Sequence, residues 1–321
     1  MTRPRTKVTA PRVALVVAAL LLIAPAVWYA AADREGAKLD DPGRKEFAPS
    51  HVRLGDGVTA YELTGGDERG TVVLIHGATI PSFAWDYQIE PLTSAGLRVV
   101  RYDQFGRGGS DRPRAKYDRV FFRKQLEELL DALGLEEEVT LVGHSLGGAI
   151  AAEYTVANPG KVDRLVLVDP VVDGVADMTP FDVARTPVVG AFAMRTMILP
   201  ALVGRADEHF ATVSDDPSRW SRLYRRQMEY EGFEDAMLAM FRSDVVGDHR
   251  PAYGKLAGTG VPVLMVWGDR DEDIRRADVD FVKAALPELD LRILEGVGHS
   301  PTMEAPERLN EILVDFIVTT K

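Results

Sequence analysis

The chain has 321 residues, of which 46% are hydrophobic and 27% are charged, and its formal net charge at pH 7 is −11. This is a globular composition with ample material for a core, and the length suits one α/β domain with an insertion. The acidic balance argues against nucleic acid as a partner, and the absence of cysteine excludes disulfides and lipid attachment through an N-terminal cysteine.

The first 32 residues are predicted to be a membrane-targeting segment. Four cations precede a run without charge from Val13 to Ala32. An apolar run of about 20 residues behind a basic start is long enough to span a bilayer with its N-terminus in the cytoplasm. It also fits a cleaved signal peptide, with Val13 to Ile23 as the apolar region and small residues at 24–26 or 30–32 for cleavage. Either way, the body lies outside the cytoplasm, membrane-anchored or exported.

Residues 33–50 are polar, contain two prolines and show no periodicity, which is typical of a linker. The folded body is expected to begin near His51, where residues 52–66 alternate like a β-hairpin.

Continuous apolar runs that end in turn residues then recur along the chain, as in strands buried on both faces of a sheet. They lie at Thr71–Gly77, Leu97–Asp103, Val139–Gly143, Arg164–Asp169, Val261–Gly268 and Leu291–Gly296. Helical patterns lie between most of them, at Phe83–Ala95, Val120–Leu133, Leu146–Asn158, Asp278–Leu286 and Pro306–Thr319. This alternation predicts an α/β fold with a mostly parallel sheet flanked by helices, whose chemistry sits at the carboxyl ends of the strands.

The alternation breaks once, between Asp169 and Val261, where helical stretches occur without a strand. We therefore expect a core made of residues 51–170 and 261–321, and a helical cap or lid at 171–260. The cap is either a helical subdomain with its own small core or a lid whose apolar underside lines an acyl pocket.

Ser145 is the candidate nucleophile. It lies in LVGHSLGGAIAAEY (Leu141–Tyr154), a GxSxG sequence that follows a strand and opens a helix. Gly143 and Gly147 relieve crowding around a turn tight enough to expose the hydroxyl, and the helix N-terminus is aimed at it. Small residues also occur at such turns in proteins where the turn has no catalytic role. The assignment of Ser145 as a nucleophile therefore depends on its partners.

A serine hydroxyl needs a base, and His299 is the candidate because it follows the last strand and precedes the final helix. The other five histidines fit less well: His51 precedes the core, His76 starts a loop, His144 should point away from the serine, and His209 and His249 lie in the insertion.

A carboxylate must hold the tautomer of the base. The loop WGDRDEDI after the strand at Val261–Gly268 offers several acids, of which Asp271 fits best and Asp273 second, with Asp169 third. The oxyanion needs two N–H donors. We expect them from Leu146, directly after the nucleophile, and from Ala78 in the loop HGATIPSFAW.

Six segments carry a resemblance to a known family: HGATIPSFAW, YDQFGRGGSDRP, LVGHSLGGAIA, LVLVDP, VLMVWGDRDED and GVGHSPTMEAPE, in this order. From about His51 onward the chain resembles the α/β-hydrolase superfamily, of the serine esterase and lipase type with a helical cap. The resemblance implies that Ser145, Asp271 and His299 stand where the family has its nucleophile, acid and base. It also implies that Asp103, Arg107 and Asp111, in YDQFGRGGSDRP, are structural.

The expected function is hydrolysis of carboxylic esters, on small-molecule or lipid-like substrates, without a metal or organic cofactor. A serine at the turn argues against the related haloalkane dehalogenases and epoxide hydrolases. Two alternatives remain: a carbon–carbon bond hydrolase of the same fold, and a ligand-binding or sensing protein without turnover. The sequence predicts neither the substrate nor the oligomeric state.

Overall fold

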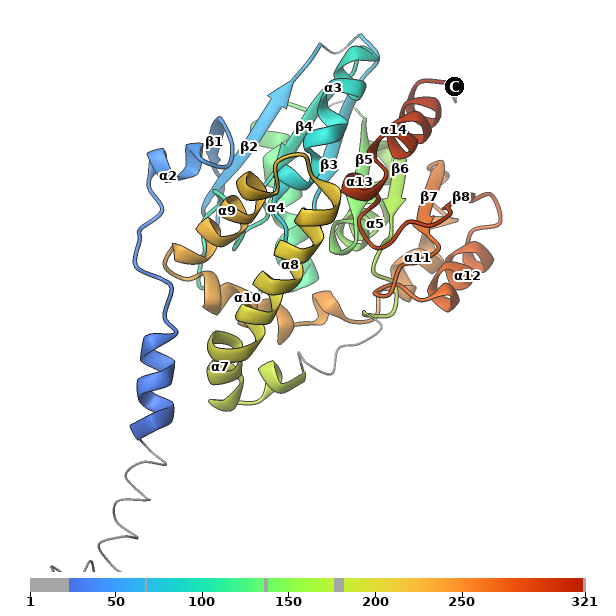
Figure 1. Ribbon diagram of the computed structural model, residues 1–321. Helices are drawn as coiled ribbons and strands as arrows, with labels where there is room; N and C mark the ends of the chain where they lie inside the picture. Colours follow the sequence, from blue (N-terminus) through green and yellow to red (C-terminus); the bar gives the residue numbers. More distant parts are fainter. Residues whose placement is uncertain (1–22, 67, 136–137, 176–181, 320–321) are drawn as a thin grey trace, which may run out of the picture.

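The computed structural model describes residues 23–66, 68–135, 138–175 and 182–319. The predicted leader therefore lies mostly outside the described residues. Its last part, residues 23–31, is helical and stands beside the body of the molecule (Figure 1).

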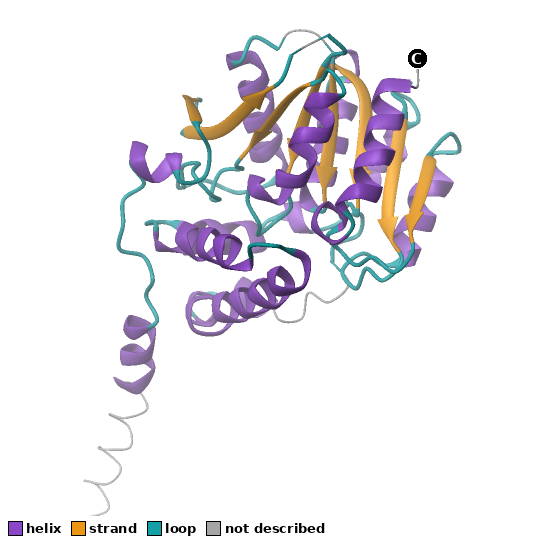
Figure 2. Ribbon diagram, turned by 45° about the horizontal axis from the view of Figure 1, so that its top comes forward, coloured by secondary structure: helices purple, strands orange, loops and turns teal. Residues whose placement is uncertain are grey.

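Within the described residues, one eight-stranded sheet forms the centre of the molecule, in the order β1-β2-β4-β3-β5-β6-β7-β8 (Figures 1 and 2). The strands are β1 (Ser50–Arg53), β2 (Val58–Thr64), β3 (Thr71–Ile75), β4 (Arg98–Tyr102), β5 (Val139–His144), β6 (Val162–Val168), β7 (Val263–Gly268) and β8 (Asp290–Leu294). The pairs β1–β2 and β2–β4 are antiparallel, and all the other pairs are parallel.

Helices cover both faces of this sheet, which explains the continuous apolar runs. Val72 and Leu74 of β3 belong to the cluster under α3 (Asp86–Ser94) and α14 (Pro306–Val314), and α14 continues as a π-helical turn, η7 (Asp315–Thr319). Val73 and Ile75 face the opposite cluster. The helices on that side are α4 (Arg119–Ala132), α5 (Leu146–Ala157), α11 (Arg250–Leu256) and α12 (Arg276–Ala285). The predicted α/β-hydrolase fold, with its mostly parallel sheet, is confirmed.

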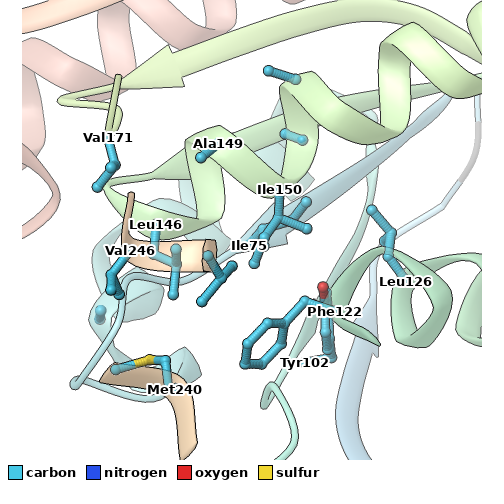
Figure 3. Close-up of a cluster of buried hydrophobic side chains, with 14 of the residues drawn as sticks. Ile75, Tyr102, Phe122, Leu126, Leu146, Ala149, Ile150, Val171, Met240 and Val246 are labelled. Carbon is cyan, nitrogen blue, oxygen red and sulfur yellow. The ribbon is translucent and has the colours of Figure 1, made fainter. Parts of the chain in front are cut away.

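Between β6 and α11, the chain folds into helices at the end of the sheet where the parallel strands stop (Figure 2). They are η3 (Val183–Arg185), α7 (Val189–Ala193), η4 (Met194–Ile198), α8 (Leu199–Val213), α9 (Pro217–Arg226), η5 (Gln227–Glu229), α10 (Phe233–Phe241) and η6 (Asp244–Val246). We call this segment the cap. Figure 3 shows its Met240 and Val246 beside Ile75 and Leu146 of the core, and all four belong to one apolar cluster. The cap therefore has no separate core among the described residues.

The stretch expected to be a linker, residues 33–50, does not run free of the body. It contains the short helix α2 (Asp41–Lys45), where Arg44 is buried, pairs with Asp111 at 2.5 Å and donates to the carbonyl of Gly109 at 2.8 Å. The N–H groups of Gly36 and Ala37 donate to the carbonyl of Glu229 in the cap. These contacts are polar and are made by charged side chains and backbone atoms, so hydrophobic periodicity does not reveal them.

Ser145 stands on a sharp turn between β5 and α5, with φ 53° and ψ −118°. This region of φ is uncommon for a residue with a side chain and is associated with strain at functional sites. Its neighbours must be glycines. A Cβ on Gly143 would overlap the carbonyl of Gly147, and a Cβ on Gly147 would overlap the carbonyls of Ile75 and His76.

We predict that Gly147→Ala destabilises the protein by about 1–3 kcal/mol, because backbone atoms of β3 would have to move. Gly204→Ala is the control, since this exposed helical glycine has nothing within 4 Å of an added Cβ; alanine there should stabilise by about 0.5–1 kcal/mol. Urea unfolding of both variants measures the difference. Equal stabilities would contradict the close packing at the turn.

Candidate active site

The three residues expected to act together do form one hydrogen-bonded chain. His299 Nε2 lies 3.0 Å from Ser145 Oγ, and His299 Nδ1 lies 2.7 Å from Asp271 Oδ2. Ser145 stands at the carboxyl end of β5, Asp271 in the loop after β7 and His299 in the loop after β8. Because these strands are parallel, their carboxyl ends meet at one edge of the sheet and bring together residues far apart in sequence.

The loop after β7 holds Asp271 in a fixed orientation. The Asp271 side chain is fully buried, and its Oδ1 accepts hydrogen bonds from the backbone N–H groups of Asp273 at 2.7 Å and Ile274 at 2.9 Å. This leaves Oδ2 for the imidazole. The arrangement matches the requirement that the acid orient the base and stabilise its charged form.

The two lower-ranked carboxylates lie near His299 without replacing Asp271. Asp273 Oδ2 is 3.9 Å from His299 Nε2, and it pairs with Arg205 of α8 at 3.0 Å. Asp169 is fully buried; its Oδ1 accepts from the N–H of Gly268 at 2.9 Å, while its Oδ2 has no hydrogen-bond partner among the described residues. Burial and the neighbouring Asp271 raise the pKa of Asp169.

The acids around His299 control its protonation. Burial alone lowers the pKa of the imidazole, but the hydrogen bond and charge of Asp271, together with the charges of Asp169 and Asp273, raise it to about 9. At neutral pH the imidazolium is therefore favoured. The neutral ring, which is the form that accepts a proton from Ser145, becomes more populated as pH rises.

Two residues that sequence reasoning missed hold the backbone around His299. Burial lowers the pKa of His144 to about 3, so its ring is neutral, and its Nε2 donates to the carbonyl of His299 at 2.7 Å. Glu304 accepts from the N–H of Gly298 at 2.6 Å and of Ser300 at 3.0 Å. Glu304 lies four residues after Ser300, one more than in a capping box, so the sequence pattern does not reveal this contact.

The expected oxyanion donors lie on the wall of the same cavity as Ser145. Leu146 is the first residue of α5, where backbone N–H groups have no acceptor within the helix. Arg107 Nε donates to the carbonyl of Ala78 at 2.6 Å, and His76 Nδ1 donates to that of Gly77 at 2.7 Å. These bonds fix the loop that carries the Ala78 N–H.

The loop expected to be structural makes structural contacts. Asp103 is buried and accepts from the N–H groups of Ser82 and Gly109, while Asp111 accepts from that of Val58 at 2.7 Å. Arg107 is buried as well and contacts the loop of Ala78 rather than the triad.

A cavity of about 350 Å³ opens over Ser145, between the core and the cap. Apolar atoms make up most of its surface, and its apolar side chains include Ile80, Val171, Leu202, Ala206, Phe241 and Met303. The charged side chains of its described lining are Arg205, Arg270, Glu272, Asp273 and Glu304. Carboxylates thus outnumber arginines, and Arg205 already pairs with Asp273.

Among the described residues, one group has ligand atoms close enough for a metal ion: His144, Asp169 and His299, within 4.8 Å of one another. The ring nitrogens of His299 already contact Ser145 and Asp271, and His144 Nε2 donates to a carbonyl. Hydrogen bonds thus already engage these nitrogens, whereas Asp169 Oδ2 has no partner among the described residues.

Comparison with known proteins agrees with the fold and with hydrolysis. The model of the alpha/beta hydrolase family matches residues 72–312. A 2-hydroxy-6-oxononadienedioate/2-hydroxy-6-oxononatrienedioate hydrolase of Paraburkholderia xenovorans is 28% identical over 276 residues, which are 83% of this chain and 93% of that protein.

Two solved structures illustrate the range of similar folds. A meta-cleavage product hydrolase from Pseudomonas fluorescens has a TM-score of 0.66 at 20% identity, over 84% of this chain and 97% of that one. A membrane phospholipase A described as a bacterial virulence factor has a TM-score of 0.69 at 24% identity, over 96% of this chain and 97% of that one. At these identities the likeness shows the fold alone.

We predict that NMR titration of the imidazole gives His299 a pKa near 9. Asp273→Asn should lower this pKa, because it removes a negative charge beside Nε2 and frees Arg205 from its partner. Glu272→Gln removes the same charge from the same loop, but Glu272 is not among the largest influences on the pKa of His299, so this variant should change the pKa little. A wild-type value at or below 6.5 would contradict this electrostatic account.

Proposed function

The chain belongs to the alpha/beta hydrolase family, and we propose that it is a serine hydrolase that cleaves carboxylic esters with apolar acyl groups. One observation carries the proposal: Ser145, His299 and Asp271 form a continuous hydrogen-bonded chain at the wall of a mainly apolar cavity. Such a cavity can bury an acyl chain beside the nucleophile.

In the acylation step, Ser145 Oγ attacks the ester carbonyl carbon while His299 Nε2 takes the hydroxyl proton. The N–H groups of Leu146 and Ala78 stabilise the negative charge on the carbonyl oxygen. When the tetrahedral intermediate collapses, His299 gives its proton to the departing alkoxide, so an alcohol leaves and an acyl-serine remains.

In the deacylation step, His299 takes a proton from water, and the resulting hydroxide attacks the acyl carbon. His299 then protonates Ser145 Oγ as the carboxylic acid leaves. Asp271 keeps the proton of His299 on Nδ1 throughout, so that Nε2 is free to exchange protons with serine, alcohol and water.

Charge in the cavity supports a neutral acyl substrate. Among its described lining residues, Arg205 pairs with Asp273, and Arg270 is exposed. A buried carboxylate without a paired cation is costly. The acids at positions 272, 273 and 304 would repel an anionic substrate further.

A second candidate is cleavage of a carbon–carbon bond by the same triad. The names of the curated relatives favour it over ester hydrolysis, because several are hydrolases of 2-hydroxy-6-oxononadienedioate. Such a substrate carries two carboxylates, for which the described cavity lining offers no buried arginine or lysine. We therefore rank it second.

We also propose that the protein is anchored to a membrane, with its catalytic body outside the cytoplasm. The uncharged run that begins at Val13 continues into the helix at residues 23–31, which exposes Ile23, Val27 and Trp28. The solved membrane phospholipase A matches 96% of this chain, against 84% for the meta-cleavage product hydrolase. This wider match supports the proposal that the N-terminal segment is part of the fold.

We predict that Ser145→Ala lowers kcat for p-nitrophenyl butyrate by about 10⁴-fold or more, because the nucleophile is lost. Ser94→Ala, at the exposed end of α3, is the control and should retain the wild-type rate. Circular dichroism checks that both variants fold. Wild-type turnover by Ser145→Ala would exclude the proposed nucleophile.

We predict that kcat/KM rises from p-nitrophenyl acetate to the octanoate, since longer chains bury more apolar surface in the cavity. Ala206→Phe fills the cavity from α8 and should reduce octanoate turnover much more than acetate turnover. 2-Hydroxy-6-oxononadienedioate tests the second candidate in parallel. Rapid turnover of that compound with none of the esters would reverse the ranking.

A further inference from the structure

Exposed large apolar side chains gather on one edge of the cap. Val183, Val188, Val189 and Met197 expose 42%, 85%, 57% and 60% of their surface. They lie in or beside η3, α7 and η4, three short helical elements of the cap. Each of these elements also has residues that are buried in the protein. We call these four residues the cap edge. Scattered exposed apolar residues need no explanation, but four within 15 positions of one short region do.

The cap edge adjoins the N-terminal helix. Phe192, which lies between Val189 and Met197, makes an edge-on ring contact with Trp28 at 5.5 Å and a stacked contact with Tyr29 at 6.2 Å. Trp28 itself remains 53% exposed, and Ile23 and Val27 expose 58% and 60%. Figure 1 shows α7 and this helix on the same side of the molecule, away from the sheet.

Ionic contacts hold the helix and the cap edge together. Arg195 pairs with Asp33 at 2.9 Å and with Glu234 of α10 at 2.6 Å, and its guanidinium lies 4.0 Å from the ring centre of Tyr29. Glu35 accepts from the N–H of Gly232 at 2.8 Å and from that of Glu234 at 2.6 Å. The residues that follow the helix are thus fixed to the cap.

The continuous helix of the cap, Val189–Val213, is apolar over its first half. Within the described residues, the helix Val189–Val213 is long enough and apolar enough to cross a membrane. However, 44% of its most apolar stretch is buried in the protein. Its buried side chains, such as Ile198 and Phe210, are part of the core. Its exposed apolar side chains lie at the N-terminal end, while Asp207 and Glu208 lie toward the other end.

We propose that the cap edge docks into the surface of the lipid bilayer that holds the N-terminal segment. The chain itself indicates this partner, because the uncharged run Val13–Ala32 includes the helix at residues 23–31, which contacts Phe192. A segment that enters the bilayer at this point brings Val188 and Met197 to the same surface. The inference rests on the membrane anchoring proposed above and adds the cap as a second contact.

Docking would connect the membrane to the cavity. Two of the docked residues, Val189 and Met197, lie on the same continuous helix, Val189–Val213, as the cavity residues Leu202 and Ala206. A bilayer that holds the first turns of this helix therefore fixes the orientation of one wall of the cavity. The consequence is a cap that keeps one orientation relative to the lipid.

Single cysteines test the docking in the full chain, which has no native cysteine to interfere. Val188→Cys and Met197→Cys place a polarity-sensitive fluorophore on the cap edge, Ile23→Cys reports anchoring, and Ile293→Cys on β8 (41% exposed) is the control. Each protein is reconstituted into phosphatidylcholine vesicles with or without brominated acyl chains. Bromine should quench the labels at positions 188, 197 and 23, and leave position 293 unchanged.

The outcomes separate the two proposals. Quenching at position 23 without quenching at 188 and 197 would overturn docking and leave anchoring intact. Quenching at none of the positions would overturn both. The fluorescence of the label at position 188 could instead change with protein concentration and not with bromine. This result would identify a second copy of the chain as the partner and would also contradict docking.

Introducing negative charge into the cap edge provides a second test. Val188→Asp combined with Val189→Asp should abolish bromine quenching of the label at position 197 but not at position 23, because carboxylates are expelled from the acyl region. Ile293→Asp is the matched control and should change neither. Unchanged quenching at position 197 in the double variant would contradict a role for the cap edge.

Discussion

The contact between His299 Nε2 and Ser145 Oγ depends on a backbone constraint at the turn between β5 and α5. Ser145 reaches the imidazole because its φ of 53° lifts the side chain out of the turn. This conformation requires Gly143 and Gly147, since α5 approaches both β5 and β3 too closely for a Cβ. The sheet order then places the loops after β7 and β8 beside this turn. The geometry of the site is therefore a consequence of how closely the core packs.

Negative charge dominates the surroundings of this contact. Asp271, Asp169 and Asp273 all favour the protonated imidazole, and Glu304 adds a further carboxylate to the cavity wall. This negative charge has two consequences. It stabilises the imidazolium that forms when Ser145 attacks, and it disfavours substrates that carry carboxylates. The same acids thus link the mechanism to the choice of substrate, which is why the ester proposal ranks above cleavage of a dicarboxylate.

The sheet and the triad were predictable because each leaves a local signal: a doubly buried strand reads as an apolar run, and Ser145, Asp271 and His299 each follow one. Other features leave no such signal. Arg44 packs against Asp111 through a charge, so residues 33–50 looked like a free linker. His144 and Glu304 act on backbone groups of the His299 loop. The cap edge is defined by which residues of an apolar helix remain exposed, and that depends on tertiary packing.

The central claim is that Ser145 is an activated nucleophile, and fluorophosphonate labelling tests it most directly. The full chain is treated with the probe, and the modified peptide is identified by mass spectrometry. We predict a single adduct on Ser145, formed faster as pH approaches 9 and lost in His299→Ala. A folded protein that reacts at another serine, or that labels equally well without His299, would contradict the account.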